Sequence, residues 1–461
     1  MTLWKGRFSV SPAQELMDFT ESLSFDRLLW MEDIRGSIAH VKGLVHSGIL
    51  TEEDGTILQD GLRSVANEIE SDLFDFNAGD EDIHSAIERR LTELVGETGA
   101  RLHTGRSRND QIATDMRLYA KRAVLEIADE LVALCRTLGD VAESSRDAYL
   151  PGYTHTQRAQ PVLLSHHVLA HGWSLLRDLE RLIETYRRLD VSPLGAGALG
   201  GSTLSLDPDF VAGELGFSRR FQNSLDVVSD RDFVAEILFD VALIGVHLSR
   251  IGEEFVLWST EEFGYVRLDD AYSTGSSMLP HKKNPDIAEL ARGKSGRLIG
   301  NLMGLLTTLK GLPLSYNRDL QEDKEPLFDS VRQVSLALLA VRGMISTASF
   351  DFVAMRMAGD SEYLVAVDLA EYLVRQGMPF RKAHGIVGGL VRDAVERRVP
   401  LAELVSAHPL LGEVAVQLLE PQSAIARRVT AGGSGTEAVS DQLRAFSSEL
   451  EAQQKVLSEL R

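Results

Sequence analysis

The sequence contains a single cysteine, Cys135, among its 461 residues. One cysteine cannot form an internal disulfide, and Cys135 lies on a helical apolar stripe, so a buried thiol is favoured over a redox role. The sequence also lacks an uncharged apolar run of roughly 18 residues, which argues against a membrane-spanning helix. Residues 1–10 lack the apolar core of a secretory signal. These absences together predict a cytoplasmic protein.

Basic charge is also scarce, since 48 Lys and Arg residues stand against 68 Asp and Glu, giving a formal net charge of −20. Nucleic acids and anionic membranes both require a basic footprint, so the composition argues against either partner. An acidic protein that handles a dianion has to concentrate its positive charge locally. The hydrophobic content of 44% is that of a globular protein rather than a disordered one.

Apolar residues recur at alternating spacings of four and three in the segments 120–141, 234–258 and 327–345. This spacing keeps an apolar seam on one side of a long helix. Two further helices are predicted at about 161–188 and 285–310, each opened by a proline suited to a first helical turn. Five long helices predict an all-α fold with a central bundle. Seams of this length often bury partner helices, so we expect an oligomer.

The segments on either side of the bundle carry shorter helical patterns. Glycines interrupt the first segment, and prolines interrupt the last one. We therefore predict an N-terminal helical domain over 1–104, a central five-helix bundle over 105–359, and a small C-terminal helical domain over 360–461.

Two patterns that suggest a cofactor or a metal are interpreted structurally. Residues 195–200 read GAGALG, but a dinucleotide-binding G-x-G-x-x-G needs a strand before it and a helix after it. A charged helical segment precedes it here, so a flexible connector is favoured. His166, His167 and His171 lie on or near one helical face, yet no H-E-x-x-H arrangement or evident third ligand accompanies them. We predict no metal site and favour packed or solvated histidines.

Polar residues cluster before several predicted helices. Residues 275–285 read GSSMLPHKKNP, with backbone amides, hydroxyls and two lysines before a helix start, where the helix dipole favours anions. Similar clusters occupy 101–111 (RLHTGRSRNDQ), 152–161 (GYTHTQRAQP) and 310–329 (KGLPLSYNRDLQEDKEPLFD). Each cluster would present donors to a carboxylate, and ordinary helix capping is the alternative for each.

These segments resemble a known family. GSSMLPHKKNPD is similar to the signature loop of the fumarase/aspartase superfamily of lyases. TGRSRNDQ, GYTHTQRAQP, DIHSAIERRL from Asp82 and the 316–324 segment resemble argininosuccinate lyases, and matches run from LWKGRF at Leu3 to PFRKAHGIV. Three departures occur: Lys5-Gly6 replaces the usual Gly-Gly, Met278-Leu279 reverses the usual order, and His281 replaces the usual glutamine.

The resemblance implies a cofactor-free β-elimination that splits argininosuccinate into arginine and fumarate. It implies that Ser276 and His155 transfer the protons, while Lys282 and Asn284 stabilise the aci-carboxylate that forms. Family analogy makes Ser276 the base, but the residues themselves leave open which of the two is the acid. The substrate-binding residues that the resemblance implies are Ser22, Asn109, Thr154, Tyr316, Gln321 and Lys324.

The resemblance also implies a three-domain helical subunit in a homotetramer. The signature loop, the His155 segment and the Asn109 segment would then reach each site from different subunits. One alternative is another superfamily lyase, such as adenylosuccinate lyase, distinguished by which succinyl compound yields fumarate. A second alternative is a structural protein like the delta-crystallins, which requires damaged motifs. The motif residues are all intact here: Ser276, Lys282, Asn284 and His155.

Overall fold

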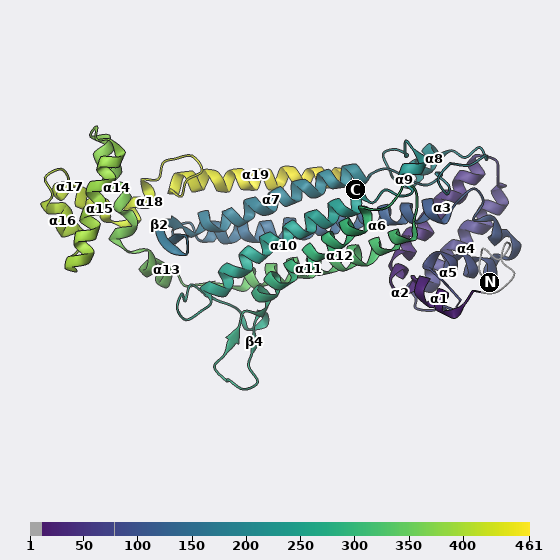
Figure 1. Cartoon of the computed structure of the whole chain (residues 1–461), viewed down its shortest axis with the longest axis horizontal. Helices are drawn as coiled ribbons and strands as arrows, with labels where there is room; N and C mark the ends of the chain where they lie inside the picture. The colour runs from purple at the N-terminus through teal and green to yellow at the C-terminus, as the bar shows by residue number, and fades with distance from the viewer. Residues whose placement is uncertain (1–11, 78) are drawn as a thin grey trace. The chain divides into compact units, whose positions relative to one another are not determined.

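The computed structural model of the chain describes residues 12–77 and 79–461. Helices dominate it, so the predicted all-α fold class is confirmed (Figure 1). No helix in this described part is both long enough and apolar enough to cross a membrane. The departures Lys5 and Gly6, and the match that begins at Leu3, lie outside the described residues. The long helices are α6 (Arg108–Ser144), α7 (Leu164–Leu189), α10 (Asp232–Trp258), α11 (Asp286–Leu309), α12 (Lys324–Thr347) and α19 (Thr436–Glu459).

Shorter helices and three antiparallel two-stranded sheets complete the described chain. The shorter α-helices are α1 (Gln14–Thr20), α2 (Leu23–Asp26), α3 (Trp30–His46), α4 (Glu52–Glu70), α5 (Ile83–Val95), α8 (Pro208–Glu214), α9 (Ser224–Val227), α13 (Phe352–Gly359), α14 (Ala366–Arg375), α15 (Phe380–Arg397), α16 (Leu401–Ala407), α17 (Gly412–Val416) and α18 (Pro421–Ala426). The 3₁₀ helices are η1 (Arg27–Leu29), η2 (Gly96–Arg101), η3 (Asp270–Tyr272), η4 (Arg318–Asp323), η5 (Glu362–Val365) and η6 (Gln417–Leu419). The strand pairs are β1 (Tyr149–Thr154) with β2 (Gln157–Leu163), β3 (Val266–Arg267) with β6 (Ser349–Phe350), and β4 (Thr274–Gly275) with β5 (Lys283–Asn284).

The chain divides into two compact units. The first comprises Met1–Ile127, Arg181–Ala242 and Arg297–Gln333, and the second comprises Ala128–Glu180, Leu243–Gly296 and Val334–Arg461. Within the second unit, helices α14 to α18 enclose an apolar core of their own around Leu369, Leu373 and Leu401. The three-domain division at residues 104 and 359 stays a prediction.

The three predicted seams form the inner faces of α6, α10 and α12. All eight seam residues of α10, from Val234 to Trp258, are at most 6% exposed. The α12 seam is buried throughout, and only Val141 of the α6 seam is half-buried. A single chain therefore already buries these stripes. The expectation that helices of other subunits cover these seams is wrong, because helices of the same chain cover them.

The two prolines expected to open helices lie just outside them. Pro161 lies in strand β2 opposite Pro151, and α7 begins only at Leu164. A two-stranded hairpin tolerates proline because its outer edges need no backbone donor. Pro285 precedes α11 directly, and its carbonyl accepts a hydrogen bond from the Glu289 N–H at 3.1 Å.

The C-terminal segment differs from the expected run of short helices. Helix α19 has 24 residues and buries Val439, Leu443, Phe446, Leu450 and Leu457. These residues repeat the four-and-three spacing of the central seams, but the polar Gln453 interrupts it. The signal for this helix was therefore present in the sequence.

Candidate active site

A cavity of about 300 Å³ in the first unit collects five of the six predicted substrate-binding residues. They come from three segments of the chain: the start of α2, the first turn of α6, and the η4 segment leading into α12. Thr154, the sixth, lies in the second unit. The five residues in the cavity are Ser22, Asn109, Tyr316, Gln321 and Lys324.

Lys324 is a buried cation at the first position of α12. Its side chain is 3% exposed, and its Nζ donates to Asp323 Oδ1 at 2.9 Å. The other Asp323 oxygen accepts from the buried Arg231 guanidinium, so two cations share one carboxylate. The cluster keeps a net positive charge, and an ammonium has three donors, of which one is used here. Lys324 can therefore offer a charge-assisted hydrogen bond to a ligand carboxylate.

The side chain of Ser22 is oriented by Asp26, another residue that lines the same cavity. Its Oγ donates to Asp26 Oδ2 at 2.6 Å, while the Ile83 N–H donates to Asp26 Oδ1 at 3.0 Å. Burial raises the pKa of the Asp26 carboxyl. The hydroxyl of Ser22 consequently has a fixed direction, with its lone pairs left for a ligand donor.

Asn109 is positioned by the glycine-rich segment that follows α7. Its Nδ2 donates to the Ala198 carbonyl at 3.0 Å. The neighbouring Asp110 accepts hydrogen bonds from the Gly195 and Gly197 amides at 3.1 and 2.8 Å, and burial raises its pKa to about 6. A helix precedes GAGALG, as expected, so a dinucleotide loop is not supported. The expected flexible connector is instead a turn tied to the first turn of α6, with Gly195 and Gly197 at φ of 103° and 64°.

The cavity also contains charged residues that the sequence did not single out as binding residues. Arg108 and Arg318 add two cations, while Glu81 and Asp82 join Asp26 as acids. Arg108 lies in the motif TGRSRNDQ and Asp82 in the motif DIHSAIERRL. Membership in these motifs is the sequence feature that could have identified them as cavity residues. Arg318 donates to Glu81 Oε1 at 2.8 Å, and Arg108 Nε lies 3.3 Å from Asp82 Oδ2. The wall thus carries both signs of charge.

Two neutral groups complete the same wall. Burial and the nearby arginines Arg106 and Arg108 lower the pKa of His103 to about 4, so its ring is uncharged at neutral pH. Burial raises the pKa of the Tyr316 hydroxyl, which therefore stays a neutral donor. Neutral donors orient a polar ligand without adding charge.

In the second unit, His155 lies at the tip of the β1–β2 hairpin and not at a helix entrance as expected. Thr154 pairs with Gln157, which leaves His155 and Thr156 as a two-residue turn with φ of 53° and 58°. Positive φ at both positions is typical of a type I′ turn, which usually uses Asn or Gly because other residues are strained there. The His155 side chain is exposed. The turn presents the imidazole outward.

The signature loop forms a second hairpin in the same unit, joined by strands β4 and β5. Ser276 Oγ accepts hydrogen bonds from the Met278 and Leu279 amides at 3.2 and 2.9 Å. These amides would stabilise negative charge on the serine oxygen. The hairpin stands clear of the neighbouring helices of its unit (Figure 1). Met278 is 85% exposed and His281 is also exposed, so two departures from the family pattern face outward.

The two adjacent lysines of this hairpin differ in their contacts. Lys283 Nζ donates to the Leu268 carbonyl and to Asp270 Oδ1, the latter at 2.6 Å. Within the described ranges, the Lys282 ammonium has no hydrogen bond or ion pair, and it is exposed. Asn284 Nδ2 donates to Thr274 Oγ1 at 3.3 Å across the strand pair. Lys283 and Asn284 shape the hairpin, and Lys282 is available to a ligand.

No hydrogen bond or ion pair among the described residues joins the Ser276 hairpin to His155. A single chain therefore does not assemble the predicted proton-transfer pair through direct contacts. The catalytic and binding roles of all ten residues stay predictions.

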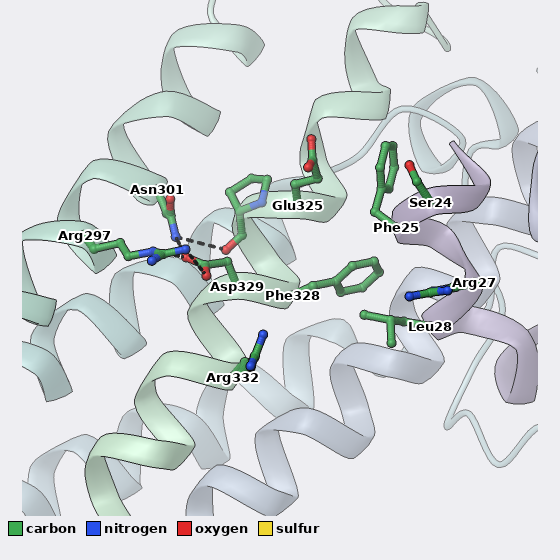
Figure 2. A pocket seen from close by; sticks show the side chains of 11 residues that line it. Ser24, Phe25, Arg27, Leu28, Arg297, Asn301, Glu325, Phe328, Asp329 and Arg332 are labelled. Carbon is green, nitrogen blue, oxygen red and sulfur yellow. Dashed lines mark hydrogen bonds and ion pairs between the residues drawn. The ribbon is translucent and has the colours of Figure 1, made fainter. Parts of the chain in front are cut away.

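Two larger cavities contain none of these ten residues. One of about 790 Å³ in the first unit lies between the start of α2 and the facing parts of α11 and α12 (Figure 2). Arg297 and Asn301 point toward Asp329 there, with Arg297 Nε 2.7 Å from Asp329 Oδ2. The other, about 730 Å³ in the second unit, includes Gln157 and Arg158. The cavity that collects five of the ten predicted residues is therefore smaller than either of these two.

Known proteins match the chain over nearly its whole length. A family model described as Lyase matches residues 6–300, and one described as Argininosuccinate lyase C-terminal matches residues 363–426. An argininosuccinate lyase from Herpetosiphon aurantiacus is 52% identical over 447 residues, covering 96% of this chain and 98% of that protein.

Solved structures agree in fold. An EDDS lyase in complex with formate has a TM-score of 0.85 at 27% identity, covering 98% of this chain and 93% of its own. A class II fumarase from Schistosoma mansoni has a TM-score of 0.76 at 14% identity, covering 91% of this chain and 93% of its own, a likeness of fold alone.

The helical fold, the signature hairpin and the Lyase match define an enzyme of the fumarase/aspartase superfamily of lyases. Within that class the identity over nearly the full length is decisive, together with the C-terminal match. The chain belongs to the argininosuccinate lyase family, and it is a carbon–nitrogen lyase.

Proposed function

We propose that the chain splits argininosuccinate into L-arginine and fumarate, and that the mixed-charge cavity of the first unit binds the substrate. The observation that carries the proposal is the charge pattern of that wall: Arg108, Arg318 and Lys324 against Asp26 and Asp82. Argininosuccinate carries carboxylates on its succinyl part and a guanidinium between its two halves. Cations suit the first and acids suit the second, since ionised partners make the stronger hydrogen bonds.

The elimination requires two proton transfers on one substrate. A base removes the proton from the carbon beside a carboxylate, and the C–N bond then breaks as the new C=C of fumarate forms. The electron pair of that bond goes to the guanidinium nitrogen of arginine, which takes a proton from an acid. We assign the base to Ser276, whose oxygen accepts two amide N–H groups, and the other transfer to His155.

The aci-carboxylate intermediate carries two negative charges on one carboxylate group. Its formation sets the barrier because the proton removed is barely acidic. Lys282 has no hydrogen bond or ion pair to any described residue, and we assign its ammonium to this charge. Asn284 supports it by bracing the base of the hairpin against Thr274.

We further propose a homotetramer in which different subunits supply the Ser276 hairpin, the His155 turn and the Asn109 segment. Support comes from a face of α11 other than the buried seams. Ile299, Met303 and Leu306 lie on one side of α11 and are 42%, 57% and 44% exposed. Exposed apolar faces of this kind mark protein–protein contacts.

We place the enzyme in the cytoplasm because of its thiol chemistry. Cys135 is fully buried on α6, and burial raises the pKa of its thiol, which keeps it protonated. A lone unreactive thiol is typical of reducing compartments.

The reaction is tested by following fumarate absorbance with argininosuccinate and adenylosuccinate side by side. We expect turnover of argininosuccinate only. Turnover of adenylosuccinate alone would contradict the substrate assignment while leaving the lyase class intact.

The shared site is tested with two inactive variants, His155→Asn and Ser276→Ala, mixed after dissociation and reassociated. If one site takes the two segments from different subunits, random equal mixing leaves about a quarter of the sites with both intact copies. Activity should therefore return in the mixture and not in either variant alone. Verified hetero-oligomers without activity would place both segments of a site on one subunit. A mixture of wild-type and His155→Asn subunits is the matched control for reassembly.

A further inference from the structure

Two histidines on α7 and a glutamate on α10 converge in the second unit. His167 and His171 are one helical turn apart, and each Nε2 lies 2.7 Å from the same oxygen, Oε2 of Glu254. No third ligand is evident in the sequence beside this histidine pair, because Glu254 is 83 residues from His171 in the chain. We propose that His167, His171 and Glu254 bind a divalent transition-metal ion of the Zn²⁺ type, a site separate from the proposed active-site residues.

The donor set is the one that such an ion prefers. Imidazole nitrogens and a carboxylate oxygen are common Zn²⁺ ligands, and two histidines four residues apart on a helix can chelate one ion. The three ligand atoms lie within 4.8 Å of one another. Two helices thus supply three ligands, and water can take the fourth position, as in open zinc sites.

The carboxylate already accepts at the atom that would bind the ion. Oε2 of Glu254 accepts a hydrogen bond from Nε2 of both His167 and His171. An ion would replace the two N–H donors, with each imidazole keeping its proton on Nδ1 instead. No hydrogen bond to either Nδ1 occurs within the described ranges, so that change of tautomer breaks no existing contact.

The side chains have room for the small shift that binding requires. Metal–ligand distances of about 2.0–2.2 Å at tetrahedral angles separate neighbouring ligand atoms by about 3.3 Å, roughly half an ångström more than here. The three side chains are 23%, 16% and 32% exposed, so they can move and an ion can enter. Trp258 lies on one side of the proposed site, with its ring centroid 5.0 Å from that of His167.

A second cluster of this kind, in the first unit, lacks these properties. Asp33, His84 and Asp115 also converge, but all three are buried, so an ion has no open path to them. The Gln111 amide already donates to Asp33, and the nearby positive charge of Arg106 would repel a metal ion. We therefore restrict the proposal to the histidine pair.

The proposal is tested by titrating the assembled, chelator-treated enzyme with Zn²⁺ in a calorimeter and by measuring its Tm with and without the ion. We expect one ion per chain and a Tm higher by a few degrees, because an ion that binds only the folded form stabilises it. His171→Gln and Glu254→Gln should each lose more than the ten- to hundredfold in affinity that loss of an outer-shell partner costs. Each variant is compared with itself without metal, which removes any effect of the lost hydrogen bond on stability.

The matched control is His166→Gln, which changes the adjacent histidine of the same helix. His166 bonds Gln442 and not Glu254, so Zn²⁺ affinity should be unchanged. Equal affinity in wild type and His171→Gln would overturn the proposal, as would no binding to the wild type. Should a variant fail to fold, Co²⁺ added to the wild type decides the matter. Intense visible absorption from low-symmetry coordination supports the site, and the weak spectrum of the hydrated ion overturns it.

Discussion

The cavity of the first unit, which holds the proposed substrate-binding residues, and the two hairpins of the second differ in how they position their side chains. In the cavity, Lys324, Ser22 and Asn109 each have a hydrogen-bond partner in their own chain, and most of the lining residues are half-buried. In the hairpins, His155 and Lys282 are exposed without side-chain partners in the described chain. One chain therefore fixes the side chains of the proposed substrate-binding residues but leaves His155 and Lys282 exposed, a contrast that the proposed sharing of sites between subunits would explain.

The strongest test of the prepared cavity is Asp323→Asn. The change leaves the buried cations Arg231 and Lys324 without their shared anion, and removing one partner of a buried pair costs about 3–5 kcal/mol of stability. Denaturant unfolding at fixed protein concentration measures it. Asp129→Asn, which breaks the exposed pair with Arg461, is the control and should cost at most about 1 kcal/mol. Equal effects of the two variants would show that the cavity charges are not prearranged as described.

Ser276→Ala tests whether Ser276, in the exposed signature hairpin, is the base. We expect turnover about a hundredfold or more lower, as for the loss of a positioned proton-transfer group, with an unchanged Tm. Stability should not change because the Ser276 side chain bonds only amides of its own exposed hairpin. Ser277→Ala is the control, with near-normal turnover. Near-wild-type turnover of an assembled Ser276→Ala enzyme would exclude Ser276 as the base and make Ser277 the next candidate.

Lys282→Met tests whether the free lysine acts on the transition state. Loss of a group that stabilises developing charge lowers kcat by about a hundredfold and changes KM little. Lys283→Met removes the anchored neighbour and should have a smaller effect on kcat, through a looser hairpin. Steady-state kinetics of both variants measures the contrast. A raised KM with normal kcat for Lys282→Met would make this residue a simple substrate anchor.

The smallest expected effect is a dependence of the free energy of unfolding on pH, caused by the buried His40. Burial and the charge of Arg106 lower the pKa of His40 to about 3. The unfolded chain takes up a proton at this residue near pH 6.5 while the folded chain does not, so stability falls as pH drops below 6.5. Between pH 7.5 and 5 the loss from His40 is about 2 kcal/mol.

Unfolding free energies at several pH values measure this loss. His40→Asn, which keeps a donor for the Thr104 carbonyl, should flatten that part of the curve. Parallel curves for the variant and the wild type would contradict the assignment.

The sequence predicted those features that depend on local periodicity or on whole motifs. The seams located α6, α10 and α12, and the motifs located the residues that line the cavity. Contacts between residues far apart in the sequence could not be predicted. Arg231 and Asp323 are 92 positions apart, and no local sequence pattern indicates that they pair. The expectation that helices of other subunits cover the seams was wrong for a related reason. Periodicity shows which face of a helix is apolar, but it does not show whether the same chain or another covers that face.

The exposed signature hairpin has a consequence for how this segment can diverge among related enzymes. Met278 and Leu279 are 85% and 44% exposed, so exchanging their order costs the subunit's own core nothing. The same holds for His281 in place of the usual glutamine. Substitutions at these positions therefore leave the folding of the subunit intact, so this loop can change without loss of the folded chain. A substitution at Asp323, by contrast, removes the anion shared by two buried cations and is felt first as lost stability.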